Sequence, residues 1–141
     1  MVSRSKILVA FLMLLSLTEI KCSDRDRDSY NCTAAICTEE FRTILLTIKH
    51  STDNTPYILS DYKVFRLPDN KDITIPGDSF LTNNGNYIVS NDSQTELFRF
   101  KNVKIEFKGY LNNDLVIQRQ FIITADCCHI SLVEGETSAV L

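Results

Sequence analysis

The sequence predicts an all-β protein, a single antiparallel β-sandwich of about seven strands that follows a signal peptide and a short tether. Three observations support this fold class. Apolar side chains recur with a period of two after residue 40. Turn signals separate the apolar segments at intervals of about 8 to 12 residues. No segment has a convincing helical period, and Thr38-Glu39-Glu40 is the one place where a single helical turn could begin.

Extended segments rich in β-branched and aromatic residues make up most of the chain after residue 40. In the first of them, residues 41–49, the side chains of Ile44, Leu46 and Ile48 share one face. β-Branched residues fit a half-buried pleated surface, which favours a strand. The other expected strands are residues 57–67, a short edge piece at 73–75, and residues 80–81, 87–89, 97–107, 115–124 and 128–133.

Turn residues separate these strands. Pro68-Asp69-Asn70 and Asn112-Asn113 are typical of tight turns. Asn84-Gly85 is the strongest turn signal, because both residues tolerate a positive φ. We therefore expect residues 80–81 and 87–89 to form a β-hairpin around Asn84-Gly85.

The N-terminus has the layout of a signal peptide. Arg4 and Lys6 precede an apolar run at residues 7–17. A membrane-spanning helix needs roughly 20 apolar residues, and this run soon meets Glu19 and Lys21. The expected organisation is a signal peptide at 1–21, a tether and N-terminal cysteine segment at 22–40, a β-sandwich domain at 41–135 and a C-terminal tail at 136–141.

Cys22 heads a short charged stretch, Ser23 to Asp28. This arrangement resembles the start of a mature bacterial lipoprotein, in which the chain is cut before a cysteine whose sulfur receives a diacylglycerol. The acidic residues after Cys22 resemble the signal that sends some Gram-negative lipoproteins to the cell surface. The resemblance implies an exported protein anchored at the outer membrane. The alternative is cleavage near residues 16–18, which would give a soluble periplasmic or secreted protein.

The number of cysteines agrees with a lipid on Cys22. The chain has five cysteines, so that assignment leaves an even four for disulfides, Cys32, Cys37, Cys127 and Cys128. Exported proteins meet oxidising conditions, which favour disulfides. The simplest pairing joins the N-terminal pair to the C-terminal pair twice, and we predict at least one such bond. The rival pairing joins Cys32 to Cys37 and the neighbours Cys127 and Cys128 to each other.

Three short motifs resemble carboxypeptidase regulatory-like domains, which have a transthyretin-like β-sandwich. They are Ser51-Thr52-Asp53-Asn54-Thr55-Pro56 after the first strand, Asn83-Asn84-Gly85-Asn86-Tyr87 at the expected hairpin, and the later strand from Val103 to Tyr110. The resemblance covers roughly residues 41 to 133. It implies a noncatalytic attachment or binding module.

Charge and composition argue against several classes of function. The net charge is −3 with no basic stripe, which gives no reason to expect a nucleic-acid partner. The two histidines and four scattered glycines form no recognisable catalytic or phosphate-binding motif. We therefore expect no enzymatic activity, no cofactor and no bound metal. The alternative is a small redox or metal-binding protein that uses Cys127-Cys128-His129, because thiolates and imidazole suit zinc and copper.

The aromatic residues offer one candidate binding surface. Phe98, Phe100, Phe107 and Phe121 fall on alternating strand positions and are expected in the core. A carbohydrate-binding platform would instead use exposed tyrosines, for which the candidates are Tyr57, Tyr62, Tyr87 and Tyr110. The function that the sequence predicts is that of a noncatalytic, exported, membrane-anchored module that has a structural role or binds an unknown protein or carbohydrate.

Overall fold

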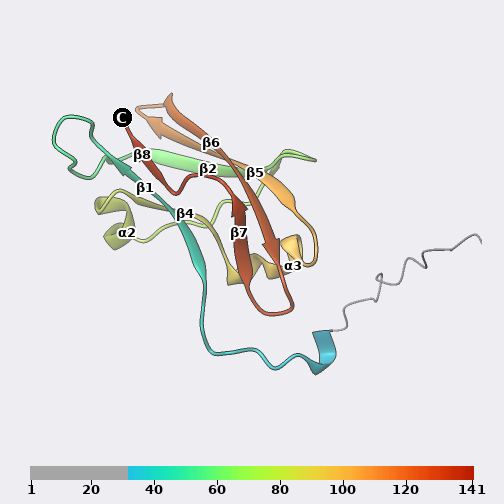
Figure 1. Ribbon diagram of the computed structural model, residues 1–141. Coiled ribbons are helices and arrows are strands. Elements are labelled where there is room, and N and C mark those ends of the chain that lie inside the picture. The colour runs from blue at the N-terminus through green and yellow to red at the C-terminus, as the bar shows by residue number, and fades with distance from the viewer. Residues whose placement is uncertain (1–31) are drawn as a thin grey trace, which may run out of the picture. The chain divides into compact units, whose positions relative to one another are not determined.

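A computed structural model describes residues 32–141. The expected signal peptide, the expected lipid site at Cys22 and the first part of the expected tether therefore lie outside the described residues. Residues 32–141 form two β-sheets, and their helices are short (Figure 1). The predicted all-β sandwich of about seven strands is confirmed.

The smaller sheet has three strands in the order β4-β1-β8. These are β4 (Asn86–Asn91), β1 (Thr43–Lys49) and β8 (Ser138–Val140). β1 runs antiparallel to β4 but parallel to β8. The expectation of a purely antiparallel sandwich is therefore wrong for this one pair.

The larger sheet has five strands in the order β3-β2-β5-β6-β7, and all neighbours are antiparallel. The strands are β3 (Lys71–Asp72), β2 (Asp61–Arg66), β5 (Val103–Leu111), β6 (Asp114–Ala125) and β7 (Ile130–Glu134). β5 and β6 are joined by the predicted turn at Asn112 and Asn113, whose φ angles are 52° and 73°. Positive φ at both central residues is what a two-residue hairpin turn requires.

One core of side chains from both sheets holds the sandwich together. The predicted inner face of β1 is confirmed, because Leu46 and Ile48 are fully buried and Ile44 packs against the core. Phe107 and Phe121 of the larger sheet are also buried. Burying one such side chain stabilises a domain by about 1.5 to 3 kcal/mol.

The hairpin predicted around Asn84-Gly85 is wrong, because a helix, α2 (Ser79–Asn83), replaces its first strand. Asp78 caps this helix by accepting a hydrogen bond from the backbone N–H of Leu81 at 2.8 Å. Phe80 is 76% exposed, so no sheet partner holds it in a strand. Gly85 does adopt a positive φ, 69°, but it ends a helix instead of joining two strands.

Residues 97–107 are also not one strand. The chain turns through η3 (Asp92–Gln94) and α3 (Thr95–Phe98), and β5 starts only at Val103. Phe98 lies in the core as expected, whereas Phe100 has a φ of 53° and is 39% exposed. The possible helical turn at residues 38–40 is absent from the described chain, whose first helical turn is η2 (Cys32–Ala34).

The expected tail at residues 136–141 contributes a strand. β8 pairs with the end of β1, and Leu141 and Lys49 are joined by a backbone hydrogen bond of 2.9 Å. Ala139 is buried in the same place. The expected edge piece at 73–75 is displaced, since β3 is residues 71–72.

Candidate functional site

Two disulfides tie the N-terminal segment to the turn between β6 and β7. Cys32 bonds to Cys127 and Cys37 to Cys128, with Cα–Cα distances of 5.3 and 5.4 Å. The predicted cross-link is confirmed, and the rival pairing of sequence neighbours is wrong. β7 starts at Ile130, so the last strand begins later than expected. Cys127 and Cys128 therefore lie in a turn, where adjacent side chains need not point to opposite faces as they would in a strand.

His129 forms a third link between the same two parts of the chain. Its Nε2 is 2.9 Å from the Thr38 hydroxyl, and its Nδ1 is 2.8 Å from a carboxylate oxygen of Asp92. The side chain is buried, at 8% exposure for the residue. His129 is thus hydrogen-bonded beside the two disulfides, and it directly precedes β7.

Asp92 lies at the centre of this hydrogen-bonded cluster. Besides His129, it accepts hydrogen bonds from the backbone N–H groups of Arg42 at 2.7 Å and Ile130 at 2.8 Å. Burial acts to raise the pKa of Asp92, but these hydrogen bonds and the nearby His129 outweigh it and lower the pKa. The sequence offered no signal for Asp92, because its partners are 37 to 50 residues away along the chain.

The lowered pKa of Asp92 predicts acid sensitivity. A carboxyl whose pKa is lower in the folded state stabilises the fold above its unfolded pKa, about 3.9, and this stability is lost as the pH falls through the folded pKa. Thermal melting of the wild type should therefore fall more steeply below about pH 4 than melting of Asp92→Asn. At neutral pH the variant should melt lower. The matched control is Asp114→Asn, at an exposed position at the start of β6, and it should keep the acid profile of the wild type. An acid profile of the wild type as shallow as that of Asp92→Asn would contradict the prediction.

A metal site at Cys127-Cys128-His129 would need free thiolates, and the described chain has none. All four cysteines of the described chain are in disulfides, and both ring nitrogens of His129 have hydrogen-bonding partners. Within residues 32–141, no group of three or more His, Cys, Asp or Glu side chains could hold a metal ion.

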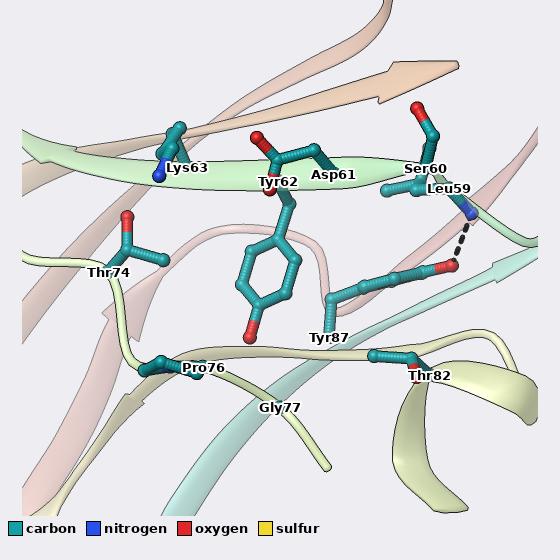
Figure 2. Close-up of a pocket in the computed structure, with 10 residues that line it drawn as sticks. All are labelled: Leu59, Ser60, Asp61, Tyr62, Lys63, Thr74, Pro76, Gly77, Thr82 and Tyr87. Atoms are coloured by element: carbon teal, nitrogen blue, oxygen red, sulfur yellow. Dashed lines mark hydrogen bonds between the residues drawn. The ribbon is translucent and has the colours of Figure 1, made fainter. Parts of the chain in front are cut away.

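A second candidate site is a pocket of about 300 Å³ beside β2 and α2 (Figure 2). In Figure 2 the ring of Tyr62 points from β2 toward Gly77, and the hydroxyl of Tyr87 points toward Leu59. The residues that line it are Leu59, Ser60, Asp61, Tyr62, Lys63, Thr74, Pro76, Gly77, Thr82 and Tyr87.

The two tyrosines of the pocket are structural. Tyr62 is 7% exposed and Tyr87 is 1% exposed, and both rings pack against Phe107. The Tyr62 hydroxyl donates to the carbonyl of Ile75 at 2.6 Å. The Tyr87 hydroxyl donates to the carbonyl of Tyr57 at 2.8 Å and accepts from the N–H of Leu59 at 2.7 Å. Burial raises the pKa of both phenols.

The expected platform of four exposed tyrosines is therefore not assembled. Tyr62 and Tyr87 have no free ring face on which a sugar could stack. Tyr57 is half-buried and packs against His50, with ring centroids 4.6 Å apart. Tyr110 is also half-buried, and its carbonyl accepts hydrogen bonds from Ser60.

The pocket wall carries few ionisable side chains. None of the ten lining residues is a histidine or cysteine, and Asp61 is their only carboxylate. Lys63 and Asp61 are the charged groups among its lining residues.

The chain was compared with family models, curated proteins and solved structures. No match was found. The resemblances to bacterial lipoproteins and to carboxypeptidase regulatory-like domains therefore stay predictions from the sequence. Among residues 32–141, no helix has the length and apolar character needed to cross a membrane.

Proposed function

We propose that the protein is an exported, noncatalytic β-sandwich module, held at a membrane surface by a lipid on Cys22, that binds a protein or carbohydrate partner there. One observation carries the proposal: the two disulfides use every cysteine of the chain except Cys22. Disulfides persist in oxidising compartments, which supports export. The remaining cysteine directly follows the signal-like segment, where bacterial lipoproteins carry their lipid.

The placement of the disulfides suits an anchored protein. A tether that starts at Cys22 enters the described chain at Cys32, which is bonded to Cys127 in the β6–β7 turn. A force on the tether would therefore be transmitted through the Cys32–Cys127 bond to the larger sheet, and it would not separate β1 from its neighbouring strands. The two acyl chains of a diacylglycerol are enough for stable anchoring.

We propose that the ligand of this module is a small polar group or the surface of a partner. The proposed location at the cell surface or outer membrane rests on the resemblance of Cys22 and the charged stretch after it to the start of a mature bacterial lipoprotein. The pocket of Figure 2 is the candidate binding site for a small ligand, because it is concave and is lined by the carboxylate of Asp61 and the ammonium group of Lys63. No residue of its lining is assigned a catalytic role.

The test is the mass and location of the full-length protein expressed in a Gram-negative host. We expect it in the membrane fraction, with an N-terminal Cys22 that carries a diacylglyceryl adduct. The variant Cys22→Ser should lose the adduct and keep both disulfides, which separates anchoring from folding. A soluble wild-type product that begins near Glu19 would overturn the proposal and favour simple secretion.

A further inference from the structure

Large apolar side chains are exposed around the β6–β7 turn, at the end of the sandwich where the N-terminal segment is cross-linked (Figure 1). Ile36 precedes Cys37, which is bonded to Cys128 in that turn, and Ile36 is 98% exposed. Phe100 donates its backbone N–H to the carbonyl of Ala125 at the end of β6, and it is 39% exposed. Two segments that are distant in sequence therefore bring exposed apolar groups to the same turn.

Phe41 extends this apolar surface toward β7. It is 63% exposed, and together with Leu132, which is 37% exposed, it lines a groove of about 470 Å³. The groove lies between the start of β1 and the start of β7, the strand that directly follows the cross-linked turn. The four side chains of Ile36, Phe41, Phe100 and Leu132 are called the apolar patch below.

Phe100 has a strained backbone. Its φ of 53° lies in the left-handed region, which bulky residues rarely adopt. Such strain persists only where the surrounding structure imposes it, and it clusters at functional positions. In the sequence the ring lies between Arg99 and Lys101. Aromatic rings beside long basic side chains suit a membrane interface, because the ring enters the apolar layer while the charges stay in water.

We propose that the apolar patch inserts into the headgroup layer of the membrane that holds the lipid of Cys22, so that this end of the sandwich faces the bilayer. The inference rests on the proposed lipid. Cys22 and Cys32 are 10 positions apart, which limits the distance between their Cα atoms to about 36 Å. Cys32 is bonded to Cys127 in the β6–β7 turn. The tether therefore enters the domain beside the patch.

The charges around the patch favour a zwitterionic lipid surface. Exposed groups of both signs are present, namely Glu39, Glu40, Asp126, Arg42 and Lys101. Arg42 and Glu40 also compensate each other at 3.2 Å. Anionic headgroups would therefore gain no net attraction, and burial of apolar surface supplies the driving force. The tether keeps the patch at a high effective concentration near the bilayer, so weak insertion is enough.

Tryptophan fluorescence tests this orientation, because the chain has no tryptophan of its own. Ile36→Trp and Phe100→Trp are made separately in the full-length lipoprotein. The matched control is Phe80→Trp, at a position that is 76% exposed on α2. α2 leads into the start of β4, which lies at the far end of β1 from Phe41.

Each purified protein, with its diacylglyceryl adduct confirmed by intact mass, is reconstituted into phosphatidylcholine vesicles. The acyl chains are either plain or brominated near the headgroup. Bromine should at least halve the emission of the Ile36→Trp and Phe100→Trp proteins, because both side chains reach the boundary between headgroups and acyl chains. The emission of Phe80→Trp should stay nearly unchanged.

Two kinds of failure are distinguishable in this experiment. Equal quenching at all three positions, or quenching at none, would overturn the inference and leave the lipid anchor standing. A protein without the adduct in its mass spectrum would overturn the proposed function, and with it the inference that rests on it. The mass is known before any vesicle is added.

A reporter at Phe41 then tests whether the patch residues act together. The indole of Phe41→Trp should be quenched, and adding Ile36→Ser and Phe100→Ser should remove most of that quenching. Adding Phe80→Ser to Phe41→Trp is the matched control and should leave the quenching unchanged. Quenching that survives in the Phe41→Trp protein with both patch serines, or that is lost equally in the control, would overturn insertion through this patch.

Discussion

Replacing both Cys127 and Cys128 by Ser should unfold much of the protein at physiological temperature. The bonds join residues 95 and 91 positions apart, so both restrict almost the same large loop. In the chain-entropy model the first bridge to close such a loop stabilises the fold by about 4.7 kcal/mol. The second then closes only the small ring of residues 32–37 and 127–128, for about 2.5 kcal/mol. Losing both costs about 7 kcal/mol, comparable with the 5 to 15 kcal/mol total of a typical domain.

The same argument predicts that the two disulfides are not additive. The matched variant Cys37→Ser with Cys128→Ser removes one bridge and keeps the large loop closed by the other. It should lose only about 2.5 kcal/mol and melt about 10 °C or more below the wild type. Thermal melting followed by circular dichroism measures both variants. A single-bridge variant that is as unstable as the variant without bridges would contradict the loop argument.

Peptide mapping under non-reducing conditions is the direct check on connectivity. The expected cross-linked peptides contain Cys32 with Cys127 and Cys37 with Cys128. Peptides that join Cys32 to Cys37 and Cys127 to Cys128, or four free thiols, would contradict it. Free thiols would also support a redox or metal-binding role for Cys127-Cys128-His129.

Truncating Tyr87 should be the most damaging single change in the pocket wall. Its ring is fully buried against Tyr62 and Phe107, so Tyr87→Ala should cost about 3 to 5 kcal/mol. Tyr87→Phe keeps the ring but leaves the buried N–H of Leu59 without its acceptor, which should cost about 1 to 3 kcal/mol.

Tyr110→Phe is the matched control for these variants. Tyr110 is half-buried and its carbonyl, not its side chain, bonds to Ser60, so its loss of a hydroxyl should change stability by less than about 0.5 kcal/mol. Chemical denaturation of the three variants measures the free energies. If Tyr87→Phe is as stable as the wild type, the two hydrogen bonds of its hydroxyl do not stabilise the fold, and the prediction is contradicted.

Local patterns were enough to predict the strands whose two faces differ. β1, β2 and β6 were placed correctly because inward positions such as Leu46, Val64 and Phe121 alternate with exposed ones. The Asn112-Asn113 turn was also predictable, since its positive φ angles are a property of the two residues themselves. The cross-link between the ends of the chain followed from cysteine parity and the order of the strands.

Short-range signals failed where two local structures compete. Asn84-Gly85 marks a change of direction, but whether a hairpin or a helix precedes it depends on capping by Asp78 and on the absence of a sheet partner for Phe80. β8 has three residues with no pattern of its own, and it is a strand only because β1 offers a free edge there.

The sequence by itself determined the all-β class and the strands β1, β2 and β6, and it favoured a bond between the N-terminal cysteines and Cys127 or Cys128, because each rests on periodicity, residue chemistry or cysteine number. The tertiary structure alone decided the burial of Tyr62 and Tyr87, the exact disulfide partners and the cluster of Asp92, His129 and Thr38. Those features depend on contacts between residues tens of positions apart. No local pattern encodes such contacts, because they form only when the two sheets pack.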